Sequence, residues 1–178
     1  MLCPEQKKLM IFSPELFPII LSTIDNNDEK EIIRQIVGRF LDYGLPIKVK
    51  QYHQPCMEGT FRILCFIKKS AEAVIINNKG MGHDGASIQV RIEDRNTLDK
   101  LGSFSENIKN QIINSANCGH CSSKCENKQY VFAYKEKAYV KCHFLCNNFY
   151  FQNMDKNDID SLMEIINNEI EHKLICVK

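Results

Sequence analysis

The sequence predicts an α+β protein in which helices pack on an antiparallel sheet, followed by a cysteine-clipped β-hairpin and a closing helix. Residues 28–43 and 103–116 carry apolar side chains at helical spacing, whereas the segments between them alternate with a period of two. Five of the nine cysteines lie from Cys118 to Cys146, around another alternating segment. We therefore expect a sheet domain over residues 1–117 and a Cys-cluster hairpin module with a C-terminal helix over 118–178, packed together as one unit.

The first half of the chain predicts two helices and four strands. Ser13-Pro14-Glu15 indicates a helix start, and Pro18 keeps that helix short. Asp28 and Glu31 form a capping pattern for the next helix, which Gly44 and Pro46 end. Strands are then expected in four runs, at Ile47 and Val49, at 61–68, at 73–77, and at 88–93. These alternating runs predict an antiparallel sheet with one face against the helix.

The second half predicts a helix, a hairpin, a strand and a final helix. Ser103 with Glu106 opens a helix that runs into Asn117, just before Cys118. Tyr130–Tyr134 and Ala138–Cys142 flank the polar turn 135–137, which predicts a β-hairpin. A further strand is expected over 149–151, and Asp155 is expected to cap a last helix with a regular apolar stripe.

Composition limits the classes of function. The chain has 178 residues, of which 44% are hydrophobic, so we expect a folded core. Its 23 basic and 22 acidic residues nearly cancel, which gives nucleic-acid binding little electrostatic support. No apolar run is long enough to cross a membrane and no signal peptide is evident, so a cytoplasmic protein is expected. The many Asn, Ile and Lys residues are typical of a bacterial protein.

The cysteine cluster predicts a metal site. Its spacing is Cys118-x2-Cys121-x3-Cys125, then sixteen residues, then Cys142-x3-Cys146. Cys118, Cys121, Cys142 and Cys146 would supply four thiolates to a tetrahedral zinc ion, and such a closed shell is structural because no position is left for a reactive water. Cys125 is a fifth thiol that could replace one ligand, bridge a second ion or remain free.

Two alternatives stay open at the cluster. His120 or His143 could replace one sulfur ligand. An all-thiolate shell alone does not choose between zinc and an iron–sulfur cluster, and zinc is favoured because aromatic-rich hairpins commonly carry zinc. Reduced or disulfide-linked cysteines without a metal are a further alternative, which is less favoured because the cysteine count is odd and no export signal is evident. Cys65 lies in an apolar run and is interpreted as a small buried hydrophobe.

Three weaker patterns have ordinary structural explanations. Gly80–Gly85 matches G-x-G-x-x-G, but a strand pattern follows it where a dinucleotide site needs a helix, so a hairpin loop is predicted. His83 and Asp84 on that loop could act as an acid–base pair, although a solvated loop is favoured. His53, Cys56 and Glu58 in the loop 51–60 could activate a thiolate, yet such a grouping arises by chance in a cysteine-rich chain. That judgement would change if His53 and His83 were neighbours.

Aromatic residues concentrate in the C-terminal third and alternate with lysines. They could stack the bases of single-stranded nucleic acid, but burial of the hairpin under the last helix is the favoured interpretation, because nearby acidic residues dilute the positive charge.

With these residues in view, the chain resembles uncharacterised small bacterial proteins in which a C-x2-C-x3-C cluster, a tyrosine-rich hairpin and a later cysteine follow an α+β domain. Residues 25–117, with a helix, the exit Tyr43-Gly44-Leu45-Pro46 and successive strands, are also similar to YdhG-type domains of unknown function. That resemblance implies a helix-backed antiparallel sheet and transfers no activity and no functional residue.

The function predicted first is that of a non-catalytic cytosolic zinc protein, whose sheet or loop surface binds a small molecule or a protein. One alternative is a redox or metal sensor that uses Cys125. Another is an enzyme whose site combines His53, Cys56 and His83, which requires these side chains to converge.

Overall fold

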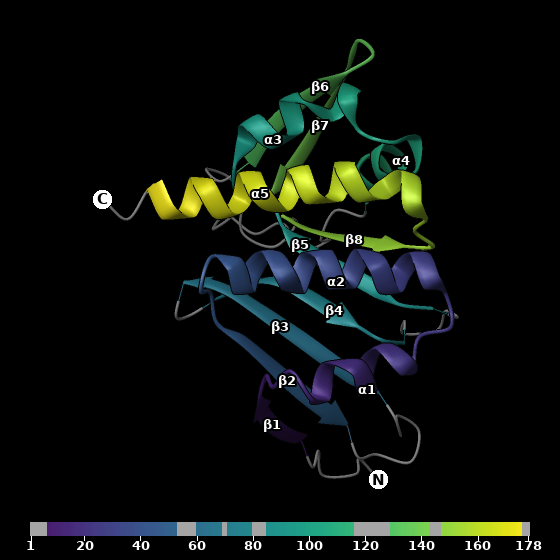
Figure 1. The fold of residues 1–178 in the computed structure, drawn as a ribbon. Helices are drawn as coiled ribbons and strands as arrows, with labels where there is room; N and C mark the ends of the chain where they lie inside the picture. The colour runs from purple at the N-terminus through teal and green to yellow at the C-terminus, as the bar shows by residue number, and fades with distance from the viewer. Residues whose placement is uncertain are drawn as a thin grey trace, which may run out of the picture. The chain divides into compact units, whose positions relative to one another are not determined.

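The computed structural model describes residues 7–52, 60–68, 71–79, 85–115, 129–142 and 147–175 (Figure 1). The chain divides into two units, the first of residues 1–88 and 152–156 and the second of residues 89–151 and 157–178. The predicted boundary between residues 117 and 118 lies outside the described ranges. Within those ranges, no helix combines the length and the apolar character needed to cross a membrane.

The sheet of the first unit confirms the α+β prediction. Its strands are β1 (Lys7–Ile11), β2 (Ile47–Tyr52), β3 (Phe61–Lys68) and β4 (Ala71–Asn77), which are neighbours in that order and antiparallel. The register aligns Val49 with Ile63 and Ile63 with Ile76, and all three are buried. This row of β-branched side chains packs well across adjacent strands and stabilises the sheet.

The long helix of the first unit, α2 (Asn27–Asp42), contacts β2. Its buried stripe consists of Ile32, Ile33, Ile36, Val37 and Phe40, which are at most 1% exposed. The helix ends where predicted, with Gly44 at φ +63°, a backbone conformation that glycine adopts without strain.

The predicted cap of α2 at Asp28 is wrong. Asn26 is the N-cap, and its Oδ1 accepts hydrogen bonds from the backbone N–H of Asp28 at 2.8 Å and of Glu29 at 3.4 Å. Asp28 is instead in the first turn, where its negative charge suits the helix dipole. Two residues of similar capping preference precede the helix closely, so local sequence could not separate them.

The short helix α1 (Leu16–Ser22) begins two residues later than the predicted start with Ser13 as cap and Pro14 as first helical residue, and its N-cap is Glu15, without a side-chain capping hydrogen bond. Ser13 Oγ accepts from the backbone N–H of Leu16 at 3.3 Å. Pro18 is the third helical residue, a position whose N–H has no partner within the helix, so the proline is tolerated there. β1, which precedes α1, was not predicted, because its pairing with β2 is a tertiary contact.

The second unit contains the remaining elements. They are β5 (Ser87–Arg91, which begins in the first unit), α3 (Arg95–Asp99), η2 (Leu101–Ser103), α4 (Glu106–Asn114), β6 (Gln129–Tyr134), β7 (Lys137–Cys142), β8 (Asn148–Gln152), η3 (Lys156–Asp158) and α5 (Ile159–Ile175). β8 is the neighbour of β5, and the N–H of Ile92 donates to the carbonyl of Asn147 at 2.8 Å. α3, which was not predicted, contacts both β6 and α5.

The predicted hairpin is present as β6 and β7, with a tighter turn than expected. Tyr134 pairs with Lys137, so the loop has two residues, Lys135 and Glu136, at φ +47° and +63°. Two consecutive positive φ values identify a type I′ turn, whose twist matches that of the strands. On one face Phe132 stacks on Tyr139 with ring centroids 5.3 Å apart, and Phe132 is buried.

The start of α4 is joined to the start of α5 by buried hydrogen bonds. Ser105 is the N-cap of α4, and the predicted cap at Ser103 is wrong because Ser103 ends a 3-10 turn. The Oγ of Ser105 donates to Asp158 Oδ1 at 2.5 Å, and Asn107 Nδ2 donates to Asp158 Oδ2 at 2.7 Å. Asp158 is 1% exposed, so these donors compensate its burial. This tertiary pairing selects Ser105 as the cap.

Candidate functional site

The cysteine cluster lies mostly outside the described residues. This holds for Cys118, Cys121, Cys125 and Cys146, and only the backbone of Cys142 is described, as the last residue of β7. Cys142 pairs with Gln129, the first residue of β6. Within the described ranges, no group of three or more His, Cys, Asp or Glu side chains is arranged to hold a metal ion. The zinc site therefore stays a prediction.

The two histidine-bearing loops start from the same end of the first unit's sheet. His53, Cys56 and His83 are themselves outside the described residues. The loop with His53 joins β2 to β3, which are antiparallel neighbours, and the loop with His83 joins β4 to β5. β3 pairs with β4, and at this end the N–H of Phe61 donates to Asn78 Oδ1 at 2.7 Å. The topology thus brings the anchors of both loops together.

A buried carboxylate lies at this same sheet end. Glu29 of α2 is 2% exposed, and its Oε2 accepts from the N–H of Ala86 at 2.9 Å, directly before β5. Burial raises the pKa of Glu29, and the hydrogen bond from Ala86 partly opposes that rise. Gly85, at φ +106°, comes so close that a Cβ there would be 3.0 Å from Glu29 Oε1. The loop that carries His83 therefore ends against a carboxyl group that takes up a proton more readily than usual.

Asn78 and Thr23 complete the hydrogen bonding at this end. Asn78 is 2% exposed, and its Nδ2 donates to Thr23 Oγ1 at 2.6 Å. The Nδ2 of Asn77 donates to Ser87 Oγ at 3.0 Å and its Oδ1 accepts from Arg62 Nε at 2.7 Å. These side chains rigidly anchor the two loops, which is the arrangement that a loop-borne site requires.

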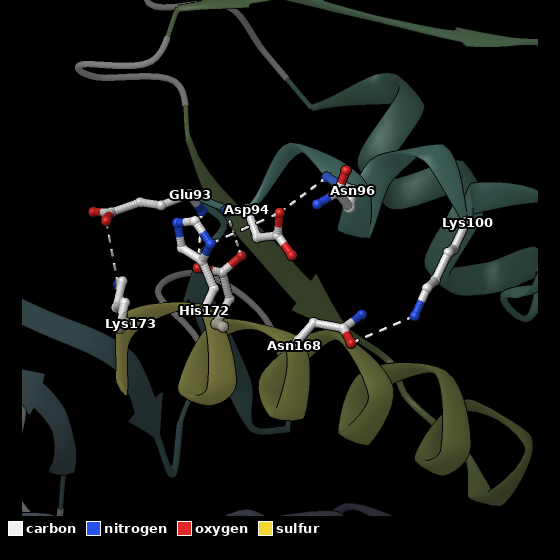
Figure 2. A network of polar contacts seen from close by, with 8 residues as sticks. Glu93, Asp94, Asn96, Lys100, Asn168, His172 and Lys173 are labelled. Atoms are coloured by element: carbon white, nitrogen blue, oxygen red, sulfur yellow. Dashed lines mark hydrogen bonds and ion pairs between the residues drawn. The ribbon is translucent and has the colours of Figure 1, made fainter. Parts of the chain in front are cut away.

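The second unit contains a polar network around the exit of β5 (Figure 2). Glu169 of α5 is 1% exposed, and its two oxygens accept from the N–H groups of Glu93 and Asp94, both at 2.9 Å. Asp94 in turn caps α3 by accepting from the N–H of Asn96 at 3.1 Å. Burial raises the pKa of Glu169, while the two backbone hydrogen bonds and the charge of Lys173 oppose the rise.

Charged side chains extend this network. Lys173 Nζ is 3.7 Å from Glu93 Oε2, whose other oxygen is 2.7 Å from Arg91 Nε. Burial lowers the pKa of Lys173, and the carboxylates of Glu93 and Glu169 oppose that shift. His172 Nδ1 lies 4.0 Å from Asp94 Oδ1. A dashed line marks this contact in Figure 2.

The network braces the second unit. Both oxygens of Glu169 accept backbone N–H groups, which fixes α5 against the start of α3. We therefore interpret this network as structural.

Sequence reasoning missed both buried carboxylates, although a signal was present. Glu29 precedes Ile32, Ile33 and Ile36 by three, four and seven positions, and so lies on the apolar stripe of its helix. Glu169 follows Leu162, Ile165 and Ile166 by seven, four and three positions, and so lies on the apolar stripe of α5. A charged residue within an apolar stripe must find a partner when the helix packs.

No family model, curated protein or solved structure matches the chain. The resemblances noted in the sequence remain predictions.

Proposed function

We propose that the protein is a non-catalytic zinc protein in which Cys118, Cys121, Cys142 and Cys146 bind one structural zinc ion. Cys125 is the fifth, alternate ligand. Four thiolates satisfy the tetrahedral preference of zinc and leave no coordination position for water, so the ion stabilises the fold and does not catalyse.

The register of the β6–β7 hairpin is the observation that carries this proposal. Gln129 is opposite Cys142, and Cys125 precedes Gln129 by four positions, while Cys146 follows Cys142 by four. A chain spans at most about 3.6 Å per residue, so Cys125 and Cys146 can each lie no more than about 15 Å along the chain from this end of the hairpin. α4 ends at Asn114, four positions before Cys118, which tethers the first pair from its other side.

The solvent exposure of the hairpin also supports the proposal that a bound metal stabilises it. Val131 and Val140 are paired across the strands and are 62% and 43% exposed. An isolated two-stranded hairpin is only marginally stable, and this one buries little of that face. A metal that joins its open end would supply the missing stability.

The cytoplasm is the proposed compartment, because free thiolates persist where the medium is reducing. The near-equal numbers of acidic and basic residues favour a small molecule or a protein as partner over nucleic acid.

Elemental analysis tests the zinc proposal. Protein purified under reducing conditions is expected to hold one zinc per chain and no iron, and Cys118→Ser with Cys121→Ser is expected to abolish the zinc content. Cys176→Ser, outside the cluster, is the matched control and should retain zinc. A wild-type preparation that is fully folded and free of metal would refute the proposal, and visible absorption with bound iron would favour the iron–sulfur alternative.

Mild peroxide tests the sensor alternative. If Cys125 is a redox switch, wild-type protein releases zinc reversibly and Cys125→Ser does not. Equal zinc retention by both proteins supports a purely structural ion.

A thiol enzyme that uses His53, Cys56 and His83 is the second candidate, and the shared anchorage of their loops beside Glu29 favours it. An imidazole near Cys56 would lower the pKa of the thiol and speed its alkylation. We expect His53→Gln or His83→Gln to slow iodoacetamide labelling of Cys56 about tenfold near neutral pH if the site exists, corresponding to one unit in thiol pKa. Labelling of Cys56 at the rate of an ordinary thiol in all three proteins would eliminate this candidate.

A further inference from the structure

An open groove lies between the two helices of the first unit. It encloses about 430 Å³ and is lined by Phe17, Pro18, Leu21 and Ser22 of α1 and by Lys30 and Arg34 of α2. This volume is within the usual range for small-molecule sites, about 300–1,000 Å³. We call it the α1–α2 groove.

One wall of the groove is apolar and ordered. Phe17 and Leu21 are four positions apart and share a face of α1. The ring of Phe17 contacts that of Phe12, with centroids 5.5 Å apart. The hydroxyl of Ser22 donates to the carbonyl of Ile19 at 2.7 Å, so its hydrogen is directed back to the helix. This wall therefore presents hydrocarbon to a ligand.

The other wall is cationic. Lys30 and Arg34 are also four positions apart, so they lie on one face of α2. Arg34 Nη1 is 3.3 Å from Glu31 Oε2, with both side chains about half exposed, and such a surface pair contributes little. With Lys30, Arg34 and Glu31 counted together, the rim has a net charge of +1. A monoanionic group matches that charge better than a dianion does.

We propose that the α1–α2 groove binds a dissolved single-chain amphiphile with a carboxylate head, of the medium-chain fatty-acid class. The alkyl chain lies along Phe17, Pro18 and Leu21, and the carboxylate lies between Lys30 and Arg34. Apolar burial supplies most of the affinity, and the charge-assisted hydrogen bonds select the sign of the head group.

A partner helix suits the groove less well. Helix-in-groove recognition uses anchors over at least two turns of the bound helix. The lining here covers only residues 17–22 of α1, about 9 Å at 1.5 Å per residue, and a single turn of α2. The groove therefore fits one flexible chain.

Calorimetry with dodecanoate tests the proposal on the full-length protein. Wild type is expected to bind dodecanoate and to bind dodecyltrimethylammonium at least tenfold more weakly. The double variant Lys30→Gln with Arg34→Gln is expected to lose about tenfold in affinity for dodecanoate, whereas Glu31→Gln should gain two- to threefold because it frees Arg34. Lys48→Gln with Lys79→Gln, which changes the net charge equally outside the groove, is the matched control and should bind like wild type.

The apolar wall is tested separately. Ser22→Phe adds bulk to the groove at an exposed position without changing charge, and it should weaken dodecanoate binding about tenfold while circular dichroism remains that of wild type. Equal binding of the two amphiphiles, no binding of dodecanoate, or unchanged binding by Ser22→Phe would overturn the proposal. Binding only to vesicles of anionic phospholipid would also overturn it. The groove contains no cysteine, so these outcomes are independent of zinc content.

Discussion

The two units each bury a helix carboxylate, and they compensate its burial differently. In the first unit Glu29 accepts one backbone N–H, from Ala86. In the second unit Glu169 accepts two, from Glu93 and Asp94, and it lies near the buried Lys173. Burial raises the pKa of both carboxyl groups. In the second unit, the buried carboxylate thus has more hydrogen-bonding and charged partners than the buried carboxylate of the first unit has.

The two units also differ in buried polar groups that have no hydrogen-bond partner. Within the described part of the chain, buried side-chain atoms without a hydrogen-bond partner occur in the second unit, among them Thr97 Oγ1 and both amide atoms of Asn147. In the first unit the buried amide of Asn78 both accepts and donates. Asn147 directly follows Cys146 in sequence. Among the described residues, the polar interior of the second unit is thus less fully hydrogen-bonded than that of the first.

Zinc removal is expected to produce the largest difference between the two units. Chelation under reducing conditions should raise amide hydrogen exchange in β6 and β7 by orders of magnitude and leave β2 and β3 unchanged, because only the second unit contains the proposed ligands. Exchange followed by mass spectrometry measures both regions in one sample. Equal protection of the hairpin before and after chelation would contradict the metal dependence.

Replacing each buried carboxylate tests whether its hydrogen-bond partners contribute to stability. Glu169→Ala leaves the N–H groups of Glu93 and Asp94 without their acceptor and removes a negative charge near Lys173, and we expect a loss of about 3–5 kcal/mol in the free energy of unfolding. Glu29→Ala unpairs a single N–H and should lose about 1–3 kcal/mol. Urea unfolding of both variants gives the two values. The reverse order would show that the extra partners of Glu169 contribute no net stability.

Titration tests the raised pKa of Glu29. A carboxyl group whose pKa is higher in the folded state binds more protons when the protein is folded. Its contribution to the free energy of unfolding is therefore complete below the unfolded pKa of about 4.3 and is lost as pH rises through the folded pKa. Glu29→Gln keeps an oxygen acceptor but cannot ionise. The variant should therefore gain stability relative to wild type as pH rises above the unfolded pKa towards neutral. Urea unfolding across this range measures the difference, and a constant difference would indicate an ordinary pKa.

Substitutions in the turns are expected to change stability least, and in opposite directions in the two units. In the first unit Gly44 occupies the left-handed region, and Gly44→Ala should cost about 1 kcal/mol. In the second unit Lys135 and Glu136 occupy that region without being glycine. Lys135→Asn with Glu136→Gly, the preferred type I′ pair, should stabilise the hairpin by about 1 kcal/mol. Thermal unfolding compares the two, and destabilisation by the Asn-Gly pair would contradict the turn assignment.

Local patterns predicted much of the fold because they report local physics. Residues 61–68 were expected as a strand and form β3 with the same bounds, and the helix near 28–43 is α2, displaced by one residue. The caps predicted at Asp28 and Ser103 were wrong because nearby residues with the same capping chemistry, Asn26 and Ser105, cap these helices instead. Burial of Cys65 as a small hydrophobe was also predictable, and its burial raises the pKa of the thiol.

Local patterns were enough to predict the α+β class and the order of most elements, since the hydrophobic period depends on near neighbours in the chain. Only the tertiary structure decided that Glu29 and Glu169 would cap the two ends of β5, that Ser105 would pair with Asp158, and that α1 and α2 would leave a groove between them. These contacts join residues more than fifty positions apart or shape a surface between helices, and no local pattern contains them.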